Sequence, residues 1–218
     1  MNELRYTLVS DGSSDRALLP ILSWLLRQQR VMCPIQPEWA DLGGLQNPPR
    51  DLSSKIEQSL DFYPCDLLFV HRDAEKLSYT QRKNEIINAL SNINPAHSLS
   101  ICVVPVRMTE AWLLIDEAAI RRAAGNVNGQ KPLDLPHPSL LEQHSNPKRL
   151  LYDLLKDASE RKGRRLSNFP VGQSALLVAE YIDDFSPLRN LSAFASLEAD
   201  LKEIVAMNKW ADPSPFMT

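Results

Sequence analysis

The chain has 218 residues and a formal net charge of −3, with 44% hydrophobic and 23% charged residues. These proportions are typical of a globular protein and exclude a disordered or fibrous chain. The small negative charge provides no overall attraction to nucleic acid, so any such binding has to come from a local basic patch.

Cysteine usage and hydropathy favour a protein of the cytoplasm. Three widely spaced cysteines, without a Cys-x-x-Cys pair, indicate reduced core residues. The first residues do not resemble a signal peptide, and no apolar run approaches the length of a membrane span. We therefore expect a cytoplasmic location.

Short apolar runs alternate with helical patterns in the first half of the chain. The runs typical of buried strands are residues 4–9, 31–35, 66–70 and 99–106. The segments with helical spacing between them are 16–29, 52–62 and 79–92. Continuous apolar strands separated by helices are typical of a parallel sheet covered on both faces. We expect an α/β fold with a doubly wound, mostly parallel sheet.

The second half changes character after a helical pattern over 109–122. The polar stretch 125–146 is long for a connection, which indicates either an active-site flap or a mobile segment. Three helical patterns follow without a clear strand: 147–162, 172–185 and 192–207. The tail 210–218 is expected to fray. The predicted organisation is an α/β core over 1–122, a flap or connecting loop over 123–146, and a helical C-terminal segment over 147–209 packed on the core.

Acidic side chains follow three of the predicted strands. Asp11 and Asp15 follow the first, Asp73 and Glu75 the third, and Glu110 the fourth. Ligands of parallel α/β sheets bind beyond the carboxyl ends of the strands, so we expect these side chains to converge. Converging carboxylates repel one another unless a cation neutralises them, and Mg²⁺ or Mn²⁺ prefers such oxygen ligands. The sequence therefore predicts a divalent metal site.

Two of these segments resemble the motifs of Toprim domains. Residues 8–19, LVSDGSSDRALL, look like the strand, Glu-Gly-x-x-Asp and helix of the first motif. Residues 67–75, LLFVHRDAE, resemble the strand and Asp-x-Asp of the second. Residues 104–114, VPVRMTEAWLL, followed by NPK at 146–148, are similar to small, poorly characterised Toprim-related proteins, often classed beside nucleases of the overcoming-lysogenization-defect type. The resemblance spans roughly the first two thirds of the chain.

The resemblance implies metal-dependent hydrolysis of phosphodiester bonds in DNA or RNA, on a Toprim-like sheet. It implies that Asp73 and Glu75 are metal ligands, that Asp11 is a ligand or the acid/base group, and that Asp15 is a ligand or supports one. Glu110 could hold a second ion. Asp11 stands where the family has Glu, and Glu75 replaces the second Asp. Lys148, at a helix start, is a candidate for neutralising phosphate charge in the transition state. A partner ATPase and a role in phage defence are implied as well, and the chain has no P-loop of its own.

Simpler interpretations of the same residues stay open. Asp11 and Asp15 could cap the first helix, Glu110 could begin the next one, and Lys148 could be a solvated lysine. A lone histidine at a strand end, such as His71, is more often structural.

The basic cluster Arg161, Lys162, Arg164 and Arg165 could lie along a nucleic-acid backbone or be a solvated helix end. One alternative function is a non-catalytic metal-binding or regulatory partner module that keeps the Toprim-like fold, which the Asp11 replacement favours. Another is a phospho-acceptor domain of the receiver type. The helical second half and the missing lysine after a fifth strand disfavour that one.

Overall fold

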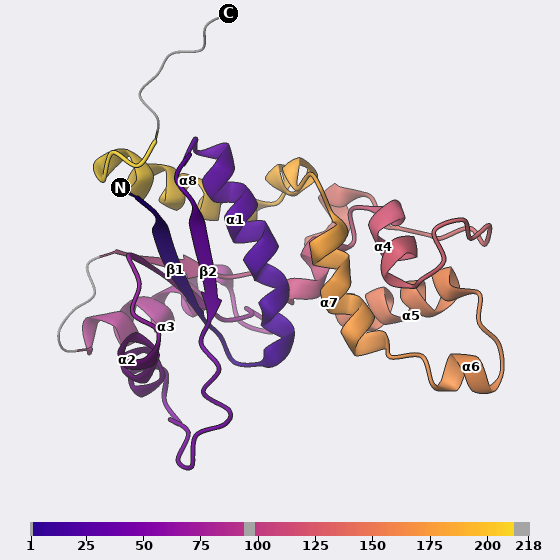
Figure 1. Ribbon diagram of the computed structural model, residues 1–218, viewed down its shortest axis with the longest axis horizontal. Helices are drawn as coiled ribbons and strands as arrows, with labels where there is room; N and C mark the ends of the chain where they lie inside the picture. Colours follow the sequence, from indigo (N-terminus) through magenta and orange to yellow (C-terminus); the bar gives the residue numbers. More distant parts are fainter. Residues whose placement is uncertain (1, 94–98, 212–218) are drawn as a thin grey trace, which may run out of the picture.

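The computed structural model describes residues 2–93 and 99–211 (Figure 1). Within them, four parallel strands form one sheet in the order β2-β1-β3-β4. The strands are β1 (Leu4–Val9), β2 (Ile35–Trp39), β3 (Leu67–His71) and β4 (Ser100–Val103). In this register Leu8 of β1 lies between Trp39 of β2 and Phe69 of β3. The prediction of an α/β fold with a parallel sheet is confirmed.

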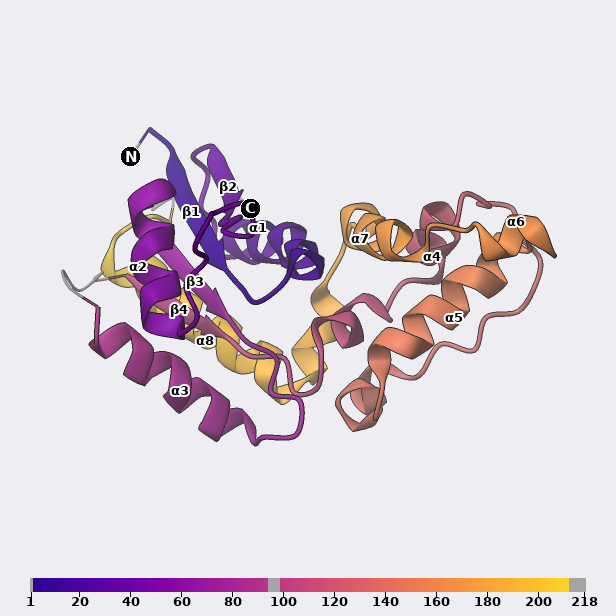
Figure 2. The same cartoon turned by 90° about the horizontal axis from the view of Figure 1, so that it is seen from below.

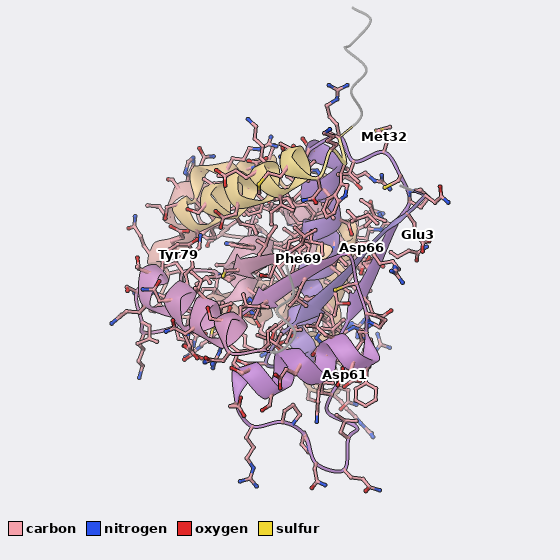
Figure 3. The ribbon with its side chains drawn as sticks, turned by 90° about the vertical axis from the view of Figure 1, so that its left-hand side faces the viewer. Glu3, Met32, Asp61, Asp66, Phe69 and Tyr79 are labelled. Atoms are coloured by element: carbon pink, nitrogen blue, oxygen red, sulfur yellow. The ribbon has the colours of Figure 1, made fainter. Side chains whose placement is uncertain are left out.

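Helices cover both faces of the sheet. The helices of one face are α1 (Leu18–Gln28) and α8 (Ser192–Met207), and those of the other are α2 (Leu52–Phe62) and α3 (Tyr79–Ser91). Side chains alternate along each strand, so Phe69 packs with the α1 and α8 core whereas Leu68 and Val70 pack with α2 and α3. Figure 3 shows the sheet between α8 on one side and α2 and α3 on the other. The sheet is therefore doubly wound, as predicted.

A separate group of helices, here called the helical lobe, lies beside the sheet (Figure 2). It consists of α4 (Glu117–Ala123), α5 (Pro147–Ser159), α6 (Arg164–Ser167) and α7 (Val171–Tyr181). The 3-10 helices are η1 (Ser13–Ala17), η2 (Thr109–Leu113), η3 (Pro138–Gln143) and η4 (Ser186–Asn190). The predicted C-terminal segment 147–209 is therefore divided between two parts of the structure. Helices α5 to α7 belong to the helical lobe, and α8 packs on the sheet.

Several element boundaries differ from the sequence expectation. The second strand is Ile35–Trp39 rather than 31–35, and Val31 forms only an antiparallel bridge with Ala211. Ala211 is thereby held at the start of the tail predicted to fray, and residues 212–218 of that tail lie outside the described residues. The first helix is divided into η1 and α1; Pro20 lacks an N–H and is tolerated in the first turn of α1.

The predicted helix 109–122 is likewise divided, because the side chain of Asp116 accepts a hydrogen bond from the Ala119 amide and starts α4 anew. None of the three cysteines, all of which are described, forms a disulfide. In the described part of the chain, no helix has the length and apolar composition that crossing a bilayer requires.

The attachment of α8 can be tested by truncating Phe194. This side chain is fully buried and packs edge-to-face on Trp112 of η2, with ring centroids 5.3 Å apart. Phe194→Ala should lower the free energy of unfolding in urea by about 3–5 kcal/mol, through lost burial and the cavity left behind. Met207→Ala on the same helix is the control, because Met207 is 70% exposed. Equal, small losses for both variants would show that α8 does not pack as described.

Candidate active site

Asp15 closes the turn that follows β1. Its Oδ2 accepts a hydrogen bond of 2.9 Å from the Gly12 amide, and the residue is buried. The capping interpretation of this residue is therefore part of its role. Its other oxygen, Oδ1, lies 3.8 Å from Nε2 of His71. Asp15 thus points one oxygen at its own turn and the other at the end of β3.

His71 lies at the centre of the site and is 2% exposed. Its Nδ1 is 3.0 Å from the carbonyl oxygen of Val103, which fixes the ring against β4. Its Nε2 is 3.5 Å from Oδ1 of Asp73 and 3.3 Å from the hydroxyl of Thr109. The single hydroxyl proton of Thr109 can be donated to one acceptor at a time. His71 is therefore held between carboxylates by contacts to two other segments.

Asp73 is the carboxylate with the most perturbed environment. Its Oδ1 accepts hydrogen bonds from the amide and the hydroxyl of Thr109, at 2.9 and 3.2 Å. Burial raises the pKa of Asp73 to about 6; His71 opposes this rise, and the negative charges of Asp15 and Glu110 add to it. The three carboxylates thus act on one another electrostatically.

Glu110 joins the cluster from η2 and is buried. Its Oε1 lies 3.0 Å from Nζ of Lys148, in the first turn of α5. Burial alone would lower the pKa of Lys148, but the hydrogen bond and charge of Glu110 outweigh it and raise that pKa. A cavity of about 20 Å³, lined in part by Ser14, Thr109 and Glu110, lies beside this ion pair. It has room for about one water molecule.

Asp11 has a different environment from the other acids. Its Oδ1 accepts a hydrogen bond of 2.7 Å from Lys55 of α2, and its Oδ2 one of 3.0 Å from Nε of Arg72. Burial would raise the pKa of Asp11, but Lys55 and Arg72 outweigh burial and lower it. Arg72 also pairs with Glu85 of α3. Asp11 is therefore neutralised by cations on the α2 and α3 side of the sheet.

Glu75 is exposed, in a loop that has left the extended conformation. Its φ is +54°, and its amide and carbonyl both bond to Arg107. The alternation that would place Asp73 and Glu75 on one side requires a strand, but β3 ends at His71. Of the five predicted ligands, the structure gathers Asp15, Asp73 and Glu110.

The donor chemistry of these three carboxylates suits Mg²⁺ or Mn²⁺. Burial and the like charges of Asp15 and Glu110 raise the pKa of Asp73 more than His71 and the Thr109 amide lower it. Among residues 2–93 and 99–211, however, no three His, Cys, Asp or Glu side chains are arranged to hold a metal ion. Glu110 would have to leave its ion pair with Lys148 to bind an ion.

The sequence pattern favours a structural role for His71 and does not single out Thr109. Both lie beside predicted acids, His71 two residues before Asp73 and Thr109 immediately before Glu110. Their position at the ends of the third and fourth apolar runs was the available signal. Their contacts to each other across β3 and β4 could be seen only in the folded chain.

The electrostatics of the site predict how Asp73→Asn changes stability. An acid whose pKa is raised by folding destabilises the protein as pH rises from the unfolded pKa to the folded one. In EDTA, Asp73→Asn should therefore raise the free energy of unfolding at pH 8 by roughly 1–3 kcal/mol and leave it almost unchanged near pH 4. The Asn oxygen can still accept from Thr109. Urea titrations at both pH values would measure this, and equal effects at both would contradict it.

Asp11→Asn is the matched control with the opposite sign. The pKa of Asp11 is lowered by folding, so its contribution to stability is present at neutral pH and is lost as pH falls. The variant should be slightly less stable than the wild type at pH 8, by less than about 1 kcal/mol because the side chain is half-exposed.

Comparisons with known proteins find no family model that matches the chain, and no curated protein or solved structure that is significantly similar to it. The relationship to Toprim domains therefore stays a prediction, based on the motifs quoted above.

Proposed function

We propose that the protein hydrolyses phosphodiester bonds of DNA or RNA, with Mg²⁺ or Mn²⁺ held by Asp15, Asp73 and Glu110. The observation that carries this proposal is the meeting of three acids from separate elements at the carboxyl edge of a parallel sheet, with Lys148 beside them. Carboxylate oxygens are the ligands that a hard divalent cation prefers, so these three side chains would be the ones to hold it. The resemblance to Toprim motifs supports the same chemistry.

Each side chain of the site would have a distinct role in the reaction. When bound, the ion would lower the pKa of the attacking water and stabilise the leaving oxygen. Thr109 fixes one oxygen of Asp73, and His71, anchored on Val103, lies 3.5 Å from that same oxygen. Lys148, released from Glu110, would donate to the phosphate and stabilise the charge of the transition state. Glu110 and Lys148 would therefore exchange partners when substrate and metal bind.

Asp11 fits a positioning role better than the acid/base role implied by the family resemblance. Both of its oxygens are occupied, by Lys55 and Arg72. In our proposal it holds these two cations at the edge of the site. The predicted ligand Glu75 has no part in the proposed mechanism.

The non-catalytic metal-binding or regulatory partner module remains a second candidate. The closed ion pair between Lys148 and Glu110 favours the regulatory form of this candidate, because the pair withholds one carboxylate from an ion. An ATPase partner, a role in phage defence and a cytoplasmic location follow from the resemblance and from composition, and they stay predictions.

Cleavage of labelled single- and double-stranded DNA and RNA tests the proposed hydrolysis. We expect turnover with Mg²⁺ or Mn²⁺, none with EDTA, and at least a hundredfold loss, on the order of that seen when a metal site is disrupted, for Asp73→Asn. Asp61→Asn is the control, since Asp61 is an exposed acid on α2 (Figure 3). Folded wild-type protein that binds Mn²⁺ but cleaves none of these substrates would favour the partner module.

Lys148→Met separates metal binding from catalysis. Removing the lysine frees Glu110, so the affinity for Mn²⁺, measured by calorimetry, should rise several-fold, because an opposite charge at about 3 Å no longer competes. Turnover should fall by about 10²-fold through loss of the transition-state cation. Unchanged Mn²⁺ affinity would show that Glu110 is not a ligand.

A further inference from the structure

A basic patch lies at the corner between α5 and α6, at the far end of the helical lobe (Figure 2). We define it as Arg161, Lys162, Arg164 and Arg165, all of which are exposed. The stretch 161–179 contains no Asp or Glu. In a chain with a net charge of −3, four positive charges within five residues make a strong local field.

The acids just before the patch are engaged elsewhere. Asp157 pairs with Nζ of Lys131 at 2.6 Å, and Oε1 of Glu160 accepts hydrogen bonds from the amides of Gln130 and Lys131. None of the four basic residues forms an ion pair within the described ranges 2–93 and 99–211. The neighbouring acids therefore contact the 130–131 segment and leave the four basic side chains without an acidic partner among the residues that the structure describes.

The basic patch also lines a groove. Gly163 has a φ of +53°, a conformation that permits the chain to turn between Lys162 and α6. Arg161, Arg164, Arg165 and Asn168 then line an open groove of about 500 Å³. The guanidinium of Arg161 lies over the ring of Phe169, 4.9 Å from its centroid, which limits its freedom. Guanidinium groups held this way match the oxygens of phosphate groups.

We propose that the basic patch binds the sugar-phosphate backbone of a nucleic acid whose scissile bond reaches the carboxylate site along α5. Lys148 is in the first turn of α5 and the patch follows its last turn. The 13 residues of α5 span about 20 Å, equal to roughly six base-pair steps of one strand. The choice of nucleic acid as ligand rests on the proposed function.

The surface between the two ends of α5 agrees with this path. A second open groove on α5 is lined by Lys148, Arg149, Tyr152 and Lys156, together with Asn146 and Asp153. Asp153 is the one acid there, and it lies 3.7 Å from Arg149 and 3.8 Å from Lys156. The exposed side of α5 therefore offers further cations between the site and the patch.

Binding of a fluorescent DNA duplex of about 20 base pairs, in EDTA and over a series of salt concentrations, tests the proposal. Arg164→Gln/Arg165→Gln should weaken binding at least about tenfold and reduce the slope of log K against log salt by about two, close to one per lost phosphate contact. Lys202→Gln/Lys209→Gln removes the same charge from exposed positions at the C-terminal end of α8 and just beyond it, and should bind like the wild type.

The outcomes separate this inference from the proposed function. The arginine variant should still cleave a small phosphodiester, bis(4-nitrophenyl) phosphate, at the wild-type rate, because that substrate does not reach the patch. Wild-type affinity and slope in the arginine variant would overturn the inference, even if the protein is a nuclease. If unlabelled polyglutamate displaced the fluorescent duplex as strongly as unlabelled duplex does, the inference would also be overturned. Patch-dependent duplex binding by a protein that cleaves nothing would refute the proposed function alone.

Discussion

The candidate site depends on the parallel pairing of β1 with β3. Their register aligns Val9 with Val70, so the chain leaves both strands at the same edge of the sheet. After β1 the chain enters η1, which contains Asp15. Strand β3 ends at His71, and Asp73 follows two residues later. β2 lies on the other side of β1, which makes this edge the point where strand order reverses and where α/β sheets bind ligands. Without this pairing, the carboxylates would have no common neighbourhood.

Carboxylates at this edge are in opposite electrostatic environments. Asp11 lies between two cations, and its pKa is lowered. Asp73 is partly buried near like charges, and its pKa is raised to about 6. Perturbed pKa values cluster at functional sites, where groups of the same type are held in different environments. The difference indicates which carboxylate retains unbalanced charge for a cation, and it is Asp73.

The ion pair between Glu110 and Lys148 joins the sheet to the helical lobe. Glu110 precedes Trp112, which packs under α8, and Lys148 begins α5, which leads to the basic patch. One helix therefore connects the acidic site with the most basic surface segment of the chain. A substrate that separates Glu110 from Lys148 would also contact the lobe, so chemistry and substrate binding would be coupled through α5.

Local sequence pattern is enough to predict the elements that depend on helical or strand spacing. The bounds of α2 and α8 are those that helical spacing predicts, and the apolar runs identify β1 and β3 almost to the residue. Because ligand-binding residues follow parallel strands, Asp15, Asp73 and Glu110 were also identifiable as candidates. Lys148 was a candidate for another reason, its place at the start of a helix within the segment that resembles Toprim-related proteins.

Which acids meet depends on contacts between distant parts of the chain. Lys55, 44 residues from Asp11 in the chain, captures that carboxylate, and the positive φ of Glu75 takes its side chain out of strand alternation. His71 acquires its role from Val103 and Thr109, both on other segments. Local spacing predicts which residue types lie at a strand end. It does not predict the long-range contacts that turn each side chain toward or away from its neighbours.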